Sequence, residues 1–325
     1  MGVSIIIPVY NVSLYLKEAI DSVLDQISVN DEVIIVDDGS TDNSGDLIDE
    51  LYTSHEQVII VHTENHGLGG ARNNGLKFAS KEFIYYFDSD DILSNSLFDS
   101  FRNELVKFPN LDLFVFSAES FHDSTDSIKL PQYDRGINGV FNTGEDAFSY
   151  LYSRDKCYPN AWIYITRKSI IDKNGLIFKS IIHEDEEYTP RLFKACGKTL
   201  VTKCIYFKRR VRSNSIMQSK YSEKNIRGYI ESINSQSELM DNSVGLFREM
   251  IRIRIINNIG LIYKIIKAED IYLSKNTLND IDEIVHKHAF IPVKILKKSY
   301  FLFRVYRYFE TRFRRRLRIP FIELN

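Results

Sequence analysis

The sequence has few cysteines and lacks any long apolar run. Cys157, Cys196 and Cys204 follow neither a disulfide framework nor the spacing of a zinc site, so we expect buried thiols in a reducing compartment. No apolar stretch approaches the roughly 20 residues of a membrane-spanning helix. The apolar run Val3 to Val9 is short and contains Pro8, unlike a signal peptide. The composition is that of a soluble enzyme.

Neither charge dominates the chain as a whole, but the distribution is uneven. The 325 residues carry 42 basic and 44 acidic side chains, a net charge of −2. Residues 291–325 hold ten basic side chains against Glu310 and Glu323, which is +8 and leaves −10 for the remainder. An acidic body with a basic tail indicates that the tail has its own partner.

The first 117 residues alternate short apolar runs with helical patterns. The runs are near-continuously apolar, as in strands covered on both faces. They are Val3 to Val9, Glu32 to Val36, Gln57 to Val61, Phe83 to Phe87 and Leu111 to Phe116. This rhythm predicts an α/β fold with a doubly wound, mostly parallel sheet, in which ligands bind beyond the carboxyl ends of the strands.

The rhythm breaks after about residue 118. Residues 123–144 are polar and predict a loop or lid before a helix at 144–153, and the sequence beyond about 222 is helical. We therefore predict a catalytic domain over 1–220, a helical extension over 221–290 and a basic amphipathic tail over 291–325.

Acidic residues follow two of the expected strands directly. Asp88, Ser89, Asp90 and Asp91 come after Phe83 to Phe87, and Asp37 and Asp38 follow Val33 to Val36. Aspartates after a strand can simply cap the next helix. Three acids at one sheet edge, however, favour a divalent cation and a phosphorylated substrate.

Two further segments carry candidate chemistry. Asn65 to Asn73 is rich in small residues and opens a helix. Arg72 stands where a dinucleotide-binding fingerprint would have glycine, so the segment is not that fingerprint. Any contact with phosphate would be made by Arg72 and the start of the helix. A tight turn with a solvated arginine is the alternative. Residues 184–187 are four consecutive acids, more than helix capping needs, and one of them could serve as a general base.

These motifs together resemble glycosyltransferase family 2, inverting enzymes of the GT-A fold that use nucleotide sugars, over roughly residues 3–215. The resemblance implies Asp185 as catalytic base, Asp90 and Asp88 as ligands of Mn²⁺ or Mg²⁺, and Trp162 and Glu184 on the acceptor side. It also implies a donor site formed by Pro8, Tyr10, Asp37, Asp38, Asn65, Arg72, Asp88, Ser89 and Arg212.

Some details of the resemblance stay open. In the family the tyrosine position of the first loop lies against the uracil ring, and the resemblance implies that either Asp37 or Asp38 contacts the base. Family members commonly have lysine where this chain has Tyr164. Arg209, Arg210 and Arg212 all fall in the segment that closes over the diphosphate.

The resemblance implies transfer of a hexose or N-acetylhexosamine from a UDP-sugar to a hydroxyl of a glycan or lipid-linked glycan, such as capsule, O-antigen or lipooligosaccharide. A sugar nucleotidyltransferase is an alternative, although the chain lacks a glycine-rich basic loop after the first strand. A non-catalytic scaffold of a polysaccharide-assembly complex is another. The intact acids argue against it.

The basic tail interleaves aromatic and basic side chains from Phe301 to Arg316. An interfacial helix on anionic lipid has this composition. We therefore expect a peripheral protein at the cytoplasmic face of the inner membrane. A solvated tail or a homo-oligomer contact is left open, and no nucleic-acid recognition motif is present.

Overall fold

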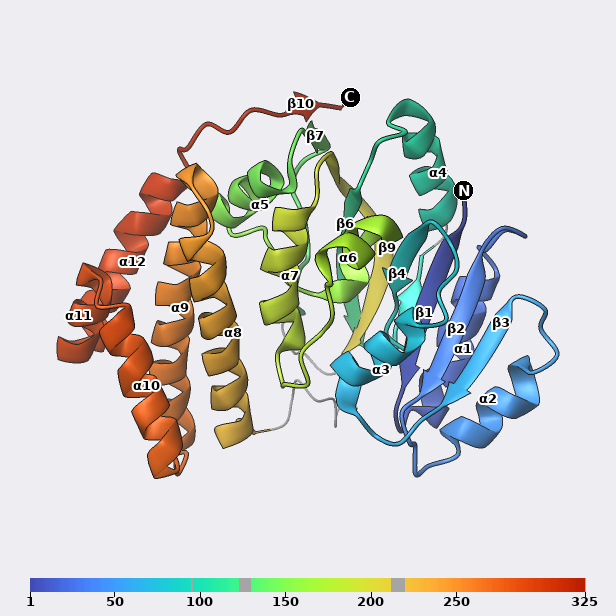
Figure 1. The fold of residues 1–325 in the computed structure, drawn as a ribbon, viewed down its shortest axis with the longest axis horizontal. Helices are drawn as coiled ribbons and strands as arrows, with labels where there is room; N and C mark the ends of the chain where they lie inside the picture. Colours follow the sequence, from blue (N-terminus) through green and yellow to red (C-terminus); the bar gives the residue numbers. More distant parts are fainter. Residues whose placement is uncertain (95, 123–129, 212–219, 325) are drawn as a thin grey trace.

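The computed structural model describes residues 1–94, 96–122, 130–211 and 220–324. Within them, ten strands form one sheet in the order β10-β7-β9-β6-β8-β4-β1-β2-β3, with β5 paired to β9 (Figure 1). The strands are β1 (Val3–Val9), β2 (Glu32–Asp37), β3 (Val58–His62), β4 (Phe83–Tyr86), β5 (Ile92–Leu93), β6 (Leu113–His122), β7 (Gly139–Phe141), β8 (Tyr164–Arg167), β9 (Thr199–Val211) and β10 (Ile322–Glu323).

Helices surround this sheet and continue beyond it. Those of the sheet region are α1 (Ser13–Leu24), α2 (Ser44–Tyr52), α3 (Gly67–Leu76), α4 (Leu97–Lys107), α5 (Gly144–Ser153), the short 3₁₀ helix η1 (Ala161–Ile163), α6 (Lys168–Asn174) and α7 (Glu184–Ala195). The C-terminal helices are α8 (Glu223–Asp241), α9 (Gly245–Glu269), α10 (Lys275–Lys287), α11 (Ile291–Lys298) and α12 (Tyr300–Arg314).

The first half of the sheet is parallel and follows the sequence pattern. β1 pairs in parallel with β2 and β4, and β2 with β3. Every residue of β1, β2 and β4 is buried, as expected for strands covered on both faces. The predicted doubly wound, mostly parallel α/β fold with a helical C-terminal region is confirmed.

The second half of the sheet is mixed. β6 runs parallel to β9 but antiparallel to β8, and β7 is antiparallel to β9. The predicted loop at 123–144 is wrong for Gly139–Phe141, which forms β7 between β9 and β10. Three residues are too short to show strand periodicity, so only their pairing partners define this strand. Residues 123–129 lie outside the described part of the chain.

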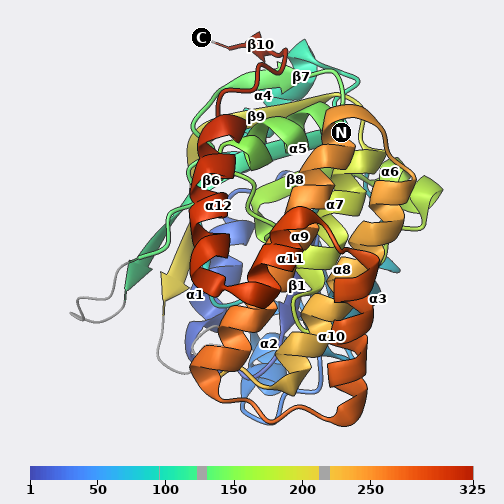
Figure 2. The same ribbon diagram turned by 90° about the vertical axis from the view of Figure 1, so that its left-hand side faces the viewer.

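The C-terminal helices lie against the sheet region rather than apart from it. α8 packs on α7, and α9 packs on α5. Figure 2 shows α9, α11 and α12 in front of this layer. Within the described residues, no helix is both long and apolar enough to cross a membrane.

The basic tail returns to the sheet. Arg314 at the end of α12 is buried, donates to the Tyr152 carbonyl and pairs with Asp155 at 2.7 Å. Beyond it, Phe321 stacks on Phe141, and β10 pairs with β7 (Figure 1). The tail is thus attached to the sheet at its end, so deleting 291–325 would remove part of the fold. Of the cysteines, Cys204 is exposed, contrary to the expectation of three buried thiols.

Gly260 in α9 marks where α12 is seated. A Cβ built at Gly260 would lie 2.6 Å from Cε1 of the buried Phe303 ring. Glycine inside a helix costs about 1 kcal/mol relative to alanine. The close approach of Phe303 accounts for a glycine at this position.

We expect Gly260→Ala to lower the free energy of unfolding by about 1–3 kcal/mol, because an added methyl group overpacks the contact. Denaturant unfolding measures the change. In a Phe303→Ala background the same substitution becomes neutral or stabilising, since only its helix propensity remains. A stabilising effect of Gly260→Ala in the wild-type background would contradict this packing.

Candidate active site

The loops after β1 and β2 are held together by Asn11. Its Oδ1 accepts from the backbone N–H groups of Thr41 (2.7 Å) and Asp42 (3.2 Å), and its own N–H donates to Ser40 Oγ. Asn11 has φ +52°, a left-handed conformation that asparagine tolerates better than most residues. Tyr10 beside it is about half exposed, at 48%. The predicted uracil platform therefore stands at an open position on a fixed loop.

The two aspartates at the end of β2 have different partners. Asp37 accepts from Ser40 N and lies 3.0 Å from His62 Nδ1, a hydrogen bond that raises the pKa of His62. Asp38 accepts from the backbone N–H of His66 at 2.9 Å and thereby fixes the loop that carries Asn65. Asp38 is buried and orders a loop, whereas Asp37 lines a surface cavity of about 430 Å³.

Arg72 is the central cation of the site. Its side chain is fully buried, and its Nη1 donates to Glu184 Oε1 (2.9 Å) and to Asp185 Oδ1 (2.8 Å). Nη2 donates to Asp88 Oδ1 at 2.9 Å. Burial opposes the charge, but the three carboxylates raise the pKa of Arg72 above its usual value. One guanidinium therefore joins acids from the β4 edge and from the start of α7.

The start of α3 is shaped for this contact. A Cβ at Gly69 would lie 2.9 Å from the Lys179 carbonyl oxygen, so only glycine lets α3 approach residues 178–184 this closely. Asn73 then exchanges two hydrogen bonds with the backbone of Phe178, whose ring lies under the Arg72 guanidinium. Gly69 and Asn73 of this segment thus pack α3 against residues 178–184 of the same chain.

Each of the four consecutive acids of α7 meets an arginine. Glu184 and Asp185 share Arg72, Glu186 pairs with Arg254 of α9, and Glu187 pairs with Arg191 at 2.6 Å. Glu187 also accepts from Ser235 of α8. Only the first two acids therefore face the strand edge, and the other two anchor α7 to the C-terminal helices.

Backbone features tighten the same attachment. Pro190 inside α7 has no N–H for the Glu186 carbonyl, and Gln236 of α8 donates to that oxygen instead, at 3.2 Å. Gly228 of α8 lies so close to the turn before α7 that a Cβ there would be 2.0 Å from the Ile182 carbonyl oxygen. His183, at φ +68°, stacks on Tyr229. The turn before Asp185 is thus built on α8.

The acids after β4 form an oxygen-rich edge. Burial and the neighbouring Asp90 raise the pKa of Asp88, although Arg72 opposes this, and the same two causes raise the pKa of Asp91. Asp91 accepts from Arg210 N at 2.6 Å, and the Arg210 side chain pairs with Glu18. Burial is the largest cause of both shifts and neighbouring aspartate charge adds to each, so a cation at this edge would favour the ionised carboxylates.

A divalent cation fits this donor set. No group of three acid, histidine or cysteine side chains forms a ready metal site within the described residues. Mg²⁺, however, commonly takes one or two carboxylates and completes its shell with water and substrate phosphates. Asp88 and Asp90 supply hard oxygen ligands at an edge where positive charge would be favourable.

Asp185 is poised between ionised and neutral forms. Burial raises its pKa to about 8, with Arg72 acting against the shift and the charges of Glu184 and Asp88 adding to it. Its Oδ1 is held by Arg72, and its Oδ2 accepts from Ala161 N at 3.3 Å. The side chain keeps 16% of its surface exposed, enough to meet a ligand.

Trp162 lies in an aromatic cluster and follows Ala161, whose backbone N–H binds Asp185. Its indole stacks on Phe207 with 4.2 Å between centroids and is only 3% exposed. Tyr133 packs on its edge, and the Tyr133 hydroxyl accepts from Arg209. In this structure Trp162 supports the η1 segment that holds Asp185, and its acceptor contact stays a prediction.

The structure brings most of the predicted site residues to one edge of the sheet. Pro8 is buried within β1, Ser89 is buried, and Asn65 is exposed beside the start of α3. Arg212 lies outside the described residues. Of the other two arginines, Arg210 is engaged by Glu18, whereas the charge of Arg209 acts on Asp88 and Asp91. The ligand contacts of all these residues stay predictions.

Sequence reasoning did not assign individual roles to Asn11, Asn73 and Arg254. Asn11 and Asn73 lie inside the recognised motifs and were available as candidates. Arg254 lies 68 residues beyond its partner, Glu186. Nothing in the local sequence indicates that pairing.

Comparison with known proteins identifies the chain. The model of the family "Glycosyl transferase family 2" matches residues 4–174, which is more than half of the 325 residues. The chain belongs to this family. The transferase is 29% identical to glycosyltransferase GlyG of Streptococcus pneumoniae over 78% of this chain and 85% of GlyG. It is 23% identical to GlyA of the same organism over 78% of this chain, but spans only 38% of the length of GlyA.

Solved structures share the fold. Staphylococcus aureus TarS 1–349 in complex with UDP-GlcNAc has a TM-score of 0.62 at 19% identity, covering 82% of this chain and 81% of that one. The mannosyltransferase PcManGT from Pyrobaculum calidifontis, in complex with GDP-Man and Mn²⁺, has a TM-score of 0.53 at 14% identity, covering 96% and 86%. The transferase therefore has the GT-A fold predicted for it.

We expect Arg72→Met to lower the free energy of unfolding by about 3–5 kcal/mol at pH 8, because three carboxylates lose their buried cation. The loss should shrink as the pH falls towards 5. Without Arg72 the folded-state pKa values of these acids rise further, so protonation at lower pH relieves the repulsion.

Denaturant unfolding at the two pH values measures this difference. Arg227→Met is the matched control, since Arg227 is about half exposed on α8, 3.7 Å from Glu223, and its loss should have a small effect at both pH values. An effect of Arg72→Met that is small, or equal at pH 5 and pH 8, would contradict the central role of this cation.

Proposed function

We propose that the protein is an inverting transferase that moves a hexose or N-acetylhexosamine from a UDP-sugar to a glycan hydroxyl. The observation that carries this proposal is the Arg72 network, which joins Asp88 of the β4 edge to Asp185 at the start of α7. A donor bound along the first edge would present its sugar towards Asp185. The UDP-GlcNAc complex of TarS supports the donor class.

The leaving group would depart at the β4 edge. Asp88 and Asp90 would hold Mn²⁺ or Mg²⁺ there, and the Mn²⁺ in PcManGT supports this assignment. The ion would stabilise the charge that develops on the diphosphate. Of the two described arginines in the 209–212 segment, Arg209, whose charge reaches Asp88 and Asp91, is the one placed to assist.

Asp185 would act as the general base. Its pKa of about 8 lies close to neutral pH. At such a pH a useful fraction of the carboxyl is ionised, and this carboxylate is a stronger base than an ordinary aspartate towards the proton of an acceptor hydroxyl. The hydrogen bonds from Arg72 and Ala161 hold both oxygens in place. A single displacement from the face opposite the diphosphate inverts the anomeric centre.

The products released from a sugar nucleotide separate this proposal from its alternatives, because a glycosyltransferase releases UDP. A sugar nucleotidyltransferase would release pyrophosphate or a nucleotide sugar, and a non-catalytic scaffold would release nothing. The acceptor we propose is a glycan or lipid-linked glycan of the cell envelope.

We expect a panel of UDP-sugars to include one from which the protein releases UDP, and the release to stop in excess EDTA and recover with Mn²⁺ or Mg²⁺. Asp90→Asn should abolish release while the thermal unfolding temperature stays within a few degrees of the wild type. Asp99→Asn, on the exposed face of α4, is the matched control and should retain activity. Full turnover in EDTA would exclude the metal.

We expect Asp185→Asn to reduce transfer at least about 10²-fold, because the amide cannot accept a proton. UDP binding should survive. For the wild type, kcat/KM should fall as the pH drops below about 8, since protonation of a carboxyl with a raised pKa removes the base. The groups that set this pKa are Arg72 of α3, Asp88 after β4 and Glu184 beside Asp185.

Two outcomes would reassign the base. Near-normal transfer by Asp185→Asn with an inactive Glu184→Gln would place it on Glu184. A pH profile that is flat between 6 and 8 would show that proton removal by this carboxyl does not limit the reaction.

A further inference from the structure

Helix α12 presents two opposite faces. Phe303, Glu310 and Arg314 lie on the inner face, where Phe303 contacts Gly260 and Arg314 pairs with Glu310 and Asp155. Arg315 adds a second ion pair to Asp155, at 2.8 Å. These contacts fix the rotation of α12 about its axis, so the outer face has a defined composition.

The outer face is apolar and exposed. Phe301 is 70% exposed, Phe309 64% and Phe313 72%, and they recur at intervals of about one or two turns. Leu302, Val305 and Tyr308 are exposed beside them. No other helix or strand within the described residues carries more than one exposed large apolar side chain. Contiguous exposed apolar surface of this kind marks an interaction site.

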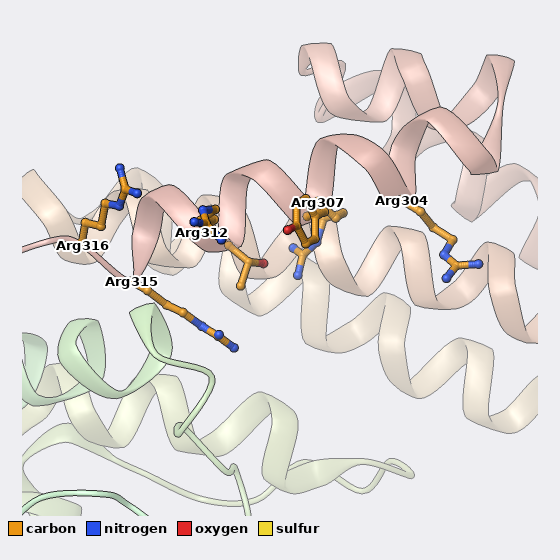
Figure 3. Close-up of a pocket in the computed structure, with 7 residues that line it drawn as sticks. Arg304, Arg307, Arg312, Arg315 and Arg316 are labelled. Atoms are coloured by element: carbon orange, nitrogen blue, oxygen red, sulfur yellow. The ribbon is translucent and has the colours of Figure 1, made fainter.

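Arginines border this apolar face. A surface groove of about 570 Å³ runs along α12 and is lined by Arg304, Arg307, Tyr308, Thr311, Arg312, Arg315 and Arg316. Figure 3 shows the five labelled arginines spaced along the helix. Guanidinium groups bind phosphate oxygens with two parallel hydrogen bonds. The groove therefore suits a row of phosphates beside an apolar layer.

We propose that α12 docks on an anionic phospholipid surface, with its aromatic side chains among the acyl chains and its arginines on the lipid phosphates. An interfacial helix needs an apolar face, a basic border and a fixed orientation, and α12 has all three. Because UDP-sugars are the proposed donor, the surface would be the cytoplasmic face of the inner membrane. The docking itself does not depend on the proposed chemistry.

Charge favours lipid over a second copy of the chain. Two α12 helices facing each other about a two-fold axis would bury their aromatics but would also bring their arginine rows together. The rest of the chain is acidic, with −10 outside residues 291–325, but it offers no second apolar face of similar extent within the described residues. A polyanionic layer above hydrocarbon matches both features at once.

The test is flotation of the full chain with vesicles, without donor or acceptor. We expect binding to equimolar phosphatidylglycerol and phosphatidylcholine, weak binding to phosphatidylcholine alone, and release as salt rises. The triple variant Arg304→Gln, Arg312→Gln, Arg316→Gln should bind the anionic vesicles about a hundredfold more weakly. It leaves the ion pairs of Arg314 and Arg315 intact.

Two further variants separate charge from position. The triple variant Lys77→Gln, Lys173→Gln, Lys203→Gln removes the same charge from exposed sites just after α3, on α6 and on β9, and should bind like the wild type. Phe309→Ser with Phe313→Ser should bind weakly although the charge is unchanged. Near-ultraviolet circular dichroism checks that each variant is folded.

Several results would overturn the proposal. One is a wild type that fails to bind anionic vesicles at low salt, and another is a triple arginine variant that binds them as the wild type does. A third is a lysine control that loses as much vesicle binding as the arginine variant, which would show that position on α12 does not matter. A concentration-dependent dimer lost on Phe309→Ser, or binding to duplex DNA in place of vesicles, would assign the face to another partner.

Discussion

The buried guanidinium of Arg72 is the interaction on which the site depends. Three largely buried carboxylates that each bond to the same group cannot all remain ionised unless that group is a cation. Arg72 supplies that cation from a helix that only small residues allow close enough. The strand edge and the start of α7 are consequently held together by charge, and neither can move without exposing an unpaired acid.

The C-terminal helices extend this arrangement. Arg254 of α9 pairs with Glu186, and Ser235 of α8 donates to Glu187. Gln236 of α8 donates to the Glu186 carbonyl, which Pro190 leaves without a helical partner. Helix α7 therefore lies between a sheet edge that carries the proposed donor site and a helical layer that fixes its rotation. What the sequence divides into a catalytic domain and an extension acts as one support for Asp185.

Local pattern predicted the parallel half of the sheet because its strands are apolar on both faces and end in polar turns. The aspartates after β2 and β4 and the acids of α7 were found in the same way. Pairings across long separations, such as Arg254 with Glu186 or β7 with β10, leave no local signal. The sequence also marked Arg72 as a phosphate contact, but burial among three acids is visible only in three dimensions.

The pairing of β10 with β7 also has a consequence for how the chain reaches its final form. β7 would otherwise leave backbone N–H and C=O groups open at the edge of the sheet, the kind of template on which strands of other molecules add. The strand that covers it follows every helix in the sequence. During synthesis this edge therefore stays uncovered until residues 322–323 have been made, and the pairing of β10 then blocks strand addition by other molecules at β7.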